Sequence, residues 1–297
     1  MKYEITNDSI HFFDTKKFQT IEDFLNHYKQ SKKNKYLLIQ NKELLLDGNV
    51  VKDVHERINH KTITLLLKKE NVDWIPSNKP CNVIYQDPFL LVVHKDAGII
   101  IHGDENDDTC LNAQVARYLI DNNIQTTVRP LHRLDKDTTG IVLYSLIPFF
   151  QPWFDDAMEQ KKIHREYLAI TYGKRKVGEK FDVHFSIGRD RHESNKYRIS
   201  KTGKDALTHC EIIEQYKEYE LIRCILDTGR THQIRVHLSS VGLPIVNDPI
   251  YGKPSKEFKN MGLWAQKISF KNPISEKNHK ISEKFSEDYK NFKYFLD

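Results

Sequence analysis

The densest group of ionisable side chains is the run RPLHRLDKDTTG, which begins at Arg129 and leads directly into the apolar residues IVLY. The end of this run suits a polar turn, in which Asp137 caps backbone groups and a glycine follows. A turn does not explain His132, Arg133 and Asp135, because ionisable groups beside a buried leucine need partners. A carboxylate next to arginines stays ionised, as a nucleophile must. The pattern therefore indicates chemistry centred on Asp135.

A second cluster, TGRTHQIRVHL, begins at Thr228 and passes from a Thr-Gly turn into a predicted helix. His232 and His237 are five residues apart, a spacing that does not place two metal ligands on one helix face. Hydrogen bonding to neighbouring groups is the better interpretation of both histidines. Arg230, at the junction of strand and helix, could grip an anion or a carboxylate, although an arginine at a turn is more often solvated.

Composition limits the class of protein. The chain has 297 residues, of which 39% are hydrophobic and 29% charged, as in a folded globular protein. Its longest apolar run, FLLVV, is far shorter than the roughly twenty residues of a membrane-spanning helix. The N-terminus lacks the apolar stretch of a secretory signal, so we expect a cytoplasmic protein without membrane association. The 4 cysteines show no metal-ligand spacing and no disulfide framework.

Positive charge is concentrated in one segment. The whole chain carries only +5, but Lys161 to Lys204 holds 13 Lys and Arg against 5 Asp and Glu, an excess of 13 − 5 = +8. Tyr167, Tyr172 and Tyr197 are interleaved with these basic residues. Such a segment fits either a solvated face or a nucleic-acid footprint.

The first eighty residues predict a small α/β unit of two helices and a short sheet. Thr20 and Ser31 are placed as N-caps. The second helix would begin with Lys32 and Lys33, whose charges oppose the helix dipole unless an anion such as phosphate lies nearby. An Asp-Gly pair between leucine and valine runs predicts a hairpin. Residues 68–81, polar and holding two prolines, are the expected linker.

The remainder predicts an α+β fold in which strands outnumber helices and follow one another directly, so a mixed, mainly antiparallel sheet flanked by helices is expected. Predicted strands lie at residues 90–93, 141–144, 167–170, 207–212 and 221–225. Predicted helices lie at residues 109–122, 148–162 and 233–241, and a short amphipathic helix is expected near residues 285–294.

Taken together, these segments resemble the RluA-type pseudouridine synthase family from about Asn82 to Pro273. Three ordered motifs carry the resemblance: HRLDKDTTG from His132, REYLAITYG from Arg165, and the cluster from Thr228. Further matches are IGRD, GKDALT and GLPIVNDPIYG. Several motifs in the family's order are far more specific than one short pattern. The resemblance implies a pseudouridine-synthase-like sheet with a central cleft.

The chain departs from the family's pattern at four positions. Asp96 replaces a customary proline, Asn247 stands where glycine is common, and Trp264 and Asn272 replace frequent histidines. All four lie outside the three catalytic motifs, so they bear on substrate choice more than on activity.

The family's chemistry detaches a uridine base from its sugar within RNA, turns the base and rejoins it through carbon, without a cofactor or metal. The resemblance implies that Asp135 is the nucleophile, that Tyr167 packs on the flipped base and helps remove the proton from the new bonding carbon, and that Arg230 pairs with Asp135. Addition to the base, attack on the sugar and a glycal-type elimination all remain open for Asp135.

The resemblance also implies contacts to the substrate. Ile234 would line the uracil pocket, Arg133 would fill the space vacated by the base or hold a phosphate, and His132 would orient the loop. Residues expected to contact RNA backbone are Lys174, Arg175 and Lys176 in the basic segment and Lys32 and Lys33 in the N-terminal unit.

We expect residues 1–80 to form a small RNA-binding domain with its linker, similar to one named after a ribosomal small-subunit protein, and residues 81–297 to form the catalytic domain. The expected partner is RNA, with large-subunit ribosomal RNA ahead of transfer RNA, and the expected state is a monomer. Two other classes stay open: a metal-dependent RNA phosphoesterase using Asp135, Asp137 and the histidines, and a catalytically silent RNA-binding module.

Overall fold

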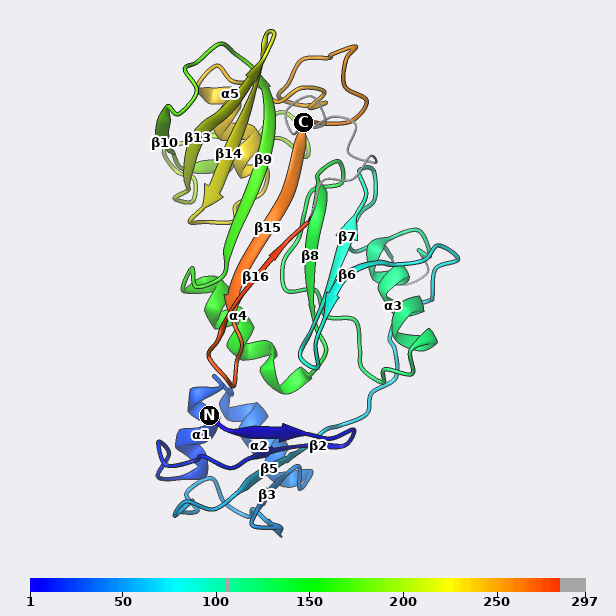
Figure 1. Cartoon of the computed structure of the whole chain (residues 1–297), viewed down its shortest axis with the longest axis vertical. Coiled ribbons are helices and arrows are strands. Elements are labelled where there is room, and N and C mark those ends of the chain that lie inside the picture. Colours follow the sequence, from blue (N-terminus) through cyan, green and yellow to red (C-terminus); the bar gives the residue numbers. More distant parts are fainter. Residues whose placement is uncertain (105–106, 284–297) are drawn as a thin grey trace.

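The computed structural model describes residues 1–104 and 107–283. Figure 1 shows an elongated molecule, with the N-terminal unit at one end, the strands around α5 at the other, and the centre of a large sheet between them. The amphipathic helix expected near residues 285–294 lies outside the described residues.

The N-terminal unit contains a five-stranded sheet in the order β1-β2-β5-β3-β4 and two helices. Thr20 caps α1 through a capping box with Asp23, and the Ser31 hydroxyl accepts a hydrogen bond from the Asn34 amide at 3.1 Å to cap α2. The predicted Asp-Gly hairpin is confirmed between β3 and β4. The elements are β1 (Tyr3–Ile5), β2 (Ser9–Phe12), α1 (Ile21–His27), α2 (Lys32–Gln40), β3 (Leu44–Leu46), β4 (Asn49–Val50) and β5 (Ile63–Leu66).

A nine-stranded mixed sheet forms most of the rest, in the order β10-β13-β14-β9-β15-β8-β7-β6, with β16 paired to β15. The pair β15–β8 is parallel, and the other strand pairs of this sheet are antiparallel. The strands are β6 (Asn82–Gln86), β7 (Leu90–Lys95), β8 (Thr139–Ser145), β9 (His164–Tyr172), β10 (Lys180–His184), β13 (Leu207–Tyr216), β14 (Tyr219–Leu226), β15 (Leu263–Lys271) and β16 (Asn278–Ser282).

Few helices accompany this sheet. They are α3 (Leu111–Asp121), the 3-10 turn η1 (Pro148–Phe150), α4 (Gln151–Glu159) and α5 (Gln233–Ser240), and a two-stranded ribbon is formed by β11 (Ile187–Arg189) and β12 (Tyr197–Ile199). The predicted α+β class is confirmed, and every helix and strand predicted between residues 82 and 241 is present. The sequence did not predict eight of the strands, which are β1, β2, β6, β10, β11, β12, β15 and β16.

One row of residues crosses the centre of the sheet. Lys95 on β7 pairs with Gly140 on β8, Gly140 with Ala265 on β15, and Ala265 with Tyr167 on β9. The parallel contact between β8 and β15 extends over only two residue pairs. Gly140 has φ of +117°, and a β-carbon there would lie 2.3 Å from the carbonyl oxygen of Ala265. The close approach of β8 to β15 therefore requires glycine at position 140.

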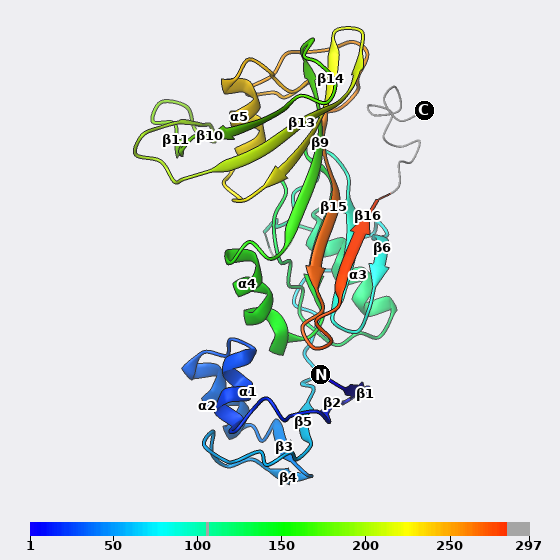
Figure 2. The same ribbon diagram turned by 60° about the vertical axis from the view of Figure 1, so that its left-hand side comes forward.

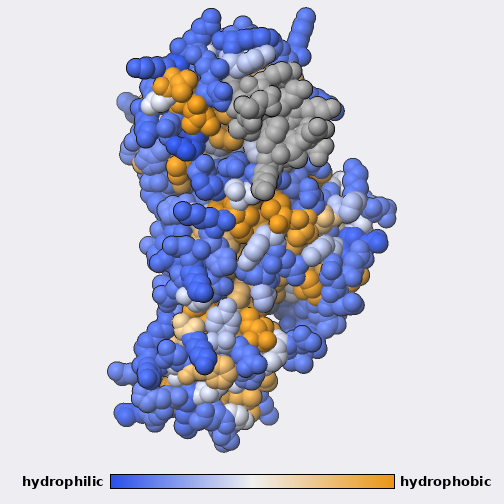
Figure 3. All heavy atoms as spheres, viewed as in Figure 1, coloured by the Kyte–Doolittle hydropathy of each residue, from blue (hydrophilic) through white to orange (hydrophobic). Residues whose placement is uncertain are grey.

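Aromatic side chains join the N-terminal unit to the remainder. The Phe149 ring lies 6.1 Å from that of Phe24 and 5.2 Å from that of Tyr28, and Tyr3 packs against Phe89. Figures 1 and 2 both show α4 between the N-terminal helices and the large sheet, and Figure 3 shows apolar atoms at this junction. One apolar cluster therefore crosses the expected boundary at residue 80, and the division into two domains stays a prediction.

The structure accommodates the four unusual residues. Asn247 has φ of +54°, a left-handed conformation that asparagine tolerates better than most residues. The Asn272 carboxamide accepts hydrogen bonds from the amides of Ile274 and Ser275. The remaining two, Asp96 and Trp264, both belong to a cluster around a buried histidine.

That cluster centres on His94, whose ring lies 3.3 Å from Asp96 and 2.8 Å from Glu283, while Trp264 donates to Glu283. Burial opposes the charge of this histidine, but the hydrogen bonds that its ring donates to Asp96 and Glu283 raise the pKa of His94 to about 9. The unusual aspartate and tryptophan are therefore parts of one polar cluster beside the central strands.

We predict that Gly140→Ala lowers the free energy of unfolding by about 3 kcal/mol or more, because it adds a backbone clash to a strained torsion. Gly178→Ala is the matched control: its φ is +86°, but nothing lies within 4 Å of the added carbon. We expect that control to cost only about 1 kcal/mol. Urea denaturation of both variants measures the difference, and equal losses would contradict the close approach of β8 and β15.

Candidate active site

A buried lysine at the end of β7 binds the loop that carries Asp135. Lys95 is fully buried, and its ammonium group donates to the carbonyl oxygens of Asp96, Ile99 and Lys136 at 2.8–2.9 Å. Burial lowers the pKa of Lys95 to about 8, although the negative charges of Asp137 and Asp135 act to raise it. Since the Lys136 carbonyl follows Asp135 directly, Lys95 fixes the loop next to the sheet.

An arginine on α5 binds Asp135. The Arg235 Nη1 atom donates to Asp135 Oδ2 at 3.0 Å, while Nε and Nη2 make a two-pronged contact with Asp248 at 2.7 and 2.9 Å. The side chains of Arg235 and Asp248 are 4% and 0% exposed, against 27% for Asp135. The guanidinium therefore spans from a buried carboxylate to one that solvent and substrate can reach.

Electrostatics stabilise this arrangement. Burial opposes the charge on Arg235. The hydrogen bonds that it donates to Asp248 and Asp135, and the negative charges of both carboxylates, raise its pKa above the ordinary value. Burial also opposes the charge on Asp248, yet the Arg235 contacts and two backbone amides lower the pKa of that carboxyl. Both groups thus remain charged, and Asp135 faces a permanent cation.

The expected pairing of Arg230 with Asp135 is wrong. Arg230 is exposed, and its Nε donates to the backbone carbonyl of Asp205 at 2.9 Å. Arg230 lies in the turn before α5 and is exposed to solvent, whereas Arg235 lies within α5 and its side chain is buried. The arginine of the third motif that contacts Asp135 is therefore Arg235.

A signal for Arg235 was present in the sequence. It stands between the apolar residues Ile234 and Val236, and residues 233–238 are all buried. A cationic side chain within such a buried helix needs an anionic partner, which in a protein is usually a carboxylate. Asp248, thirteen residues further along the chain, supplies it.

Apolar side chains flank Asp135 on the sheet side. Tyr167 and Ile234, which are 5% and 4% exposed, belong to the same apolar cluster as Leu134. Burial raises the pKa of Tyr167, a shift that Arg165 opposes and Asp135 reinforces, so the phenol is neutral at pH 7. The structure therefore brings Tyr167 near Asp135, and Ile234 directly precedes the arginine that binds Asp135.

The neighbours of Asp135 in its own motif separate into one buried and one exposed residue. His132 is buried, its Nε2 accepts a hydrogen bond from the Leu143 amide at 3.4 Å, and burial lowers its pKa to about 3. A neutral His132 thus attaches the loop to β8. Arg133 is exposed, so its charge is accessible to RNA.

The basic residues after β9 lie away from this site. At about 3.3 Å per residue, the end of β9 at Tyr172 is roughly 17 Å from Tyr167. Arg175 is half-buried, contacts Glu179 at 3.2 Å and stacks on the Phe181 ring at 4.5 Å, whereas Lys174 and Lys176 are exposed. Any contact these lysines make is with RNA outside the target nucleotide.

Lys32 and Lys33 are exposed in the first turn of α2, which contains no acidic residue. They lie in the N-terminal unit, at the opposite end of the molecule from α5 (Figure 1). If both ends contact RNA, the substrate must extend along the length of the protein.

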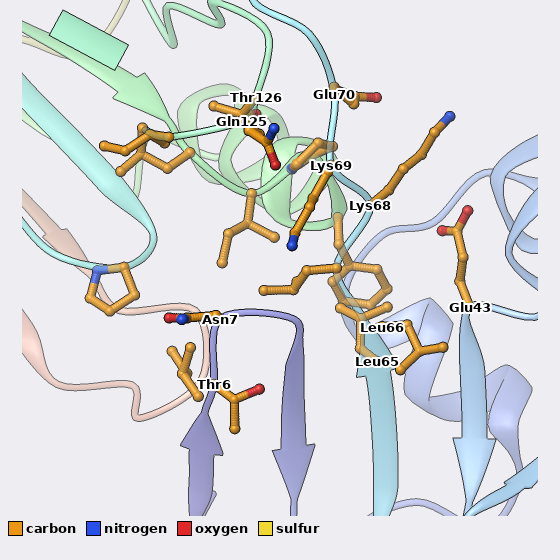
Figure 4. A pocket seen from close by; sticks show the side chains of 18 of the residues that line it. Thr6, Asn7, Glu43, Leu65, Leu66, Lys68, Lys69, Glu70, Gln125 and Thr126 are labelled. Carbon is orange, nitrogen blue, oxygen red and sulfur yellow. The ribbon is translucent and has the colours of Figure 1, made fainter. Parts of the chain in front are cut away.

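A cavity of about 1040 Å³ lies between the N-terminal unit and the large sheet. Figure 4 shows Thr6, Asn7, Lys69 and Gln125 around it. Its lining includes no residue of the three motifs, so it is separate from Asp135. Within residues 1–104 and 107–283, no three His, Cys, Asp or Glu side chains are grouped to hold a metal ion.

Comparison with known proteins agrees with the fold and the motifs. Residues 89–240 match the RNA pseudouridylate synthase family model. The uncharacterized RNA pseudouridine synthase YhcT of Bacillus subtilis is 31% identical over 91% of this chain and 86% of that protein. The ribosomal large subunit pseudouridine synthase D of Xanthomonas campestris is 32% identical, covering 84% of this chain and 80% of that protein.

A solved structure, human RNA pseudouridylate synthase domain containing 1, superposes with a TM-score of 0.59 at 23% identity over 69% of this chain and 83% of that chain. This likeness supports the fold. The chain belongs to the RNA pseudouridine synthase family, in its RluA-type branch, and is an isomerase that acts on RNA. None of the described helices is long and apolar enough to cross a membrane.

We predict that Arg235→Lys lowers the single-turnover rate of pseudouridine formation by about 10-fold or more, since lysine keeps the charge but cannot bridge two carboxylates. Arg230→Lys is the matched control and should stay within about twofold of the wild type, as exposed substitutions usually do. A rapid-quench assay at saturating RNA measures both. Equal effects of the two substitutions would contradict the assignment of Arg235.

Proposed function

We propose that this enzyme isomerises specific uridines of large-subunit ribosomal RNA and that Asp135 is its nucleophile. The observation that carries the role of Asp135 is its place beside Tyr167, partly exposed and bound to the buried Arg235 guanidinium. Two relatives support the RNA target, because the Xanthomonas campestris and Vibrio vulnificus proteins are both named ribosomal large subunit pseudouridine synthase D.

The target nucleotide must leave its stack to reach Asp135. Flipping costs a few kcal/mol and is cheapest where the base is already unpaired. The exposed Arg133 stands two residues before Asp135, where its guanidinium can take the place of the base or hold a phosphate. The apolar faces of Tyr167 and Ile234 then receive the uracil ring.

Arg235 binds one oxygen of the Asp135 carboxylate without covering the group, which stays 27% exposed. Three mechanisms can begin from this carboxylate: it can attack the base, attack the sugar, or assist an elimination. Tyr167 is a neutral phenol, so it acts mainly by packing on uracil and by hydrogen bonding. A neutral phenol can accept the proton from carbon 5 only if it gives up its own hydroxyl proton to another acceptor.

We predict that Asp135→Asn lowers tritium release from RNA labelled at uracil carbon 5 by at least about 1,000-fold, as removal of a nucleophile does. The amide has the same shape, so folding and RNA binding should persist. Asp121→Asn is the control, because the Asp121 side chain is 50% exposed and, among the residues that the structure describes, its ion pair is with Arg117 on the surface of α3. Turnover retained by Asp135→Asn would overturn the role of Asp135.

The RNA target is tested by mapping pseudouridines in total RNA from cells with and without the gene. We expect particular positions of large-subunit ribosomal RNA to lose the modification and to regain it with the wild-type gene, but not with Asp135→Asn. Loss confined to transfer RNA would contradict the ribosomal target while leaving the chemistry intact.

A further inference from the structure

His232 occupies a strained position next to the site. It precedes α5 with φ of +57°, a left-handed conformation that costs a non-glycine residue on the order of 1 kcal/mol or more. Its side chain makes no capping hydrogen bond to the helix and is only 12% exposed. The strained backbone thus turns a buried imidazole away from the helix.

Hydrogen bonds determine which ring nitrogen carries the proton. The Tyr251 hydroxyl accepts from the Tyr197 amide at 2.7 Å and lies 2.9 Å from His232 Nδ1. Among the described residues, Nδ1 is the only acceptor within hydrogen-bond distance of this hydroxyl, so we infer that the hydroxyl donates its proton to Nδ1. A neutral ring that accepts at Nδ1 carries its proton on Nε2.

The protonated nitrogen faces the nucleophile. His232 Nε2 lies 3.8 Å from Asp135 Oδ2, the same oxygen that Arg235 binds at 3.0 Å. Oδ1 of Asp135 has no hydrogen-bond partner among the residues that the structure describes. Arg235 and His232 therefore both lie on the side of Oδ2, and Oδ1 is left available to a substrate.

The charges around the ring are consistent with a neutral imidazole. The ionisable groups that face it are Asp135, Arg235, Asp248, Tyr197 and Tyr251. Burial lowers the pKa of His232, and Arg235 lowers it further, against the attraction of Asp135 and Asp248. The ring thus places an N–H near the nucleophile without adding a second full positive charge beside it.

We infer that His232 is a positioning residue: its Nε2–H, oriented by Tyr251, lies 3.8 Å from Asp135 Oδ2 and closes to hydrogen-bond distance when the target nucleotide binds. Together with Arg235 it then holds Oδ2 and presents Oδ1 to that nucleotide. This inference rests on the proposed role of Asp135 as the nucleophile. It also gives the left-handed torsion a role, since the side chain that leaves this position lies near both Tyr251 and Asp135.

Two substitutions of His232 distinguish the effect of its N–H donor from the effect of the size of its ring. Glutamine places an N–H close to the position of imidazole Nε2, and alanine places none; both meet the same strained torsion. We expect His232→Ala to lower the single-turnover rate about 10-fold to 100-fold, as loss of an orienting partner does. We expect His232→Gln to stay within about threefold of the wild type, with RNA affinity unchanged in both.

His60→Ala is the matched control, because His60 also has a left-handed φ, of +63°, but is exposed in the N-terminal unit. It should leave the single-turnover rate unchanged. Thermal melting of all variants checks that each is folded. A wild-type rate in His232→Ala, or equal loss in the alanine and glutamine variants, would overturn the inference.

A spectroscopic measurement tests the tautomer without reference to turnover. In protein labelled with nitrogen-15 histidine, the resonances that disappear in His232→Gln identify His232. We expect the Nε2–H tautomer at pH 7 in the wild type and its loss in Tyr251→Phe, which keeps the ring that packs on Arg235. An Nδ1–H tautomer or an imidazolium in the wild type would overturn the inference.

The two proposals fail in different ways. If Asp135→Asn remains active, the proposed nucleophile is wrong, whatever His232 does. If Asp135→Asn is inactive while His232→Ala is as fast as the wild type, only the positioning role of His232 is wrong.

Discussion

The site depends on one guanidinium placed between two carboxylates. Arg235 is almost fully buried, and removing one partner from such a buried pair costs about 3–5 kcal/mol because the remaining charge is left uncompensated. The buried Asp248 accepts hydrogen bonds from two nitrogens of Arg235, and the third nitrogen donates to Asp135. The cation that binds the proposed nucleophile is therefore in place before RNA binds.

The large sheet gives this contact its geometry. The row Lys95, Gly140, Ala265 and Tyr167 crosses four strands, so the loop support and the aromatic wall of the site belong to one rigid surface. Lys95 holds the loop at one side, and α5 brings Arg235 from the other. Asp135 is thus fixed by elements far apart in the chain, which is why the site needs most of the domain.

Much of this could be read from the sequence. Asp135 was identified because its motif concentrates charge against an apolar strand, and α5 was predicted to within a residue or so of its true ends. The choice between Arg230 and Arg235 could not be made from spacing, because it depends on which side chains face inward. In a helix buried on all sides, as here from residue 233 to residue 238, hydrophobic periodicity does not mark the inward face. The short strands β1 and β2 were missed because three or four residues carry too little pattern.

The most direct test of this account is a double-mutant cycle on the single-turnover rate, with Asp248→Asn and Arg235→Lys made singly and together. Asp248 touches Arg235 and not Asp135, so the account predicts that each single variant is slow and that the double variant is little slower than the worse of the two, because both substitutions break the same contact. Losses that simply multiply would contradict the claim that Asp248 acts on Asp135 through Arg235.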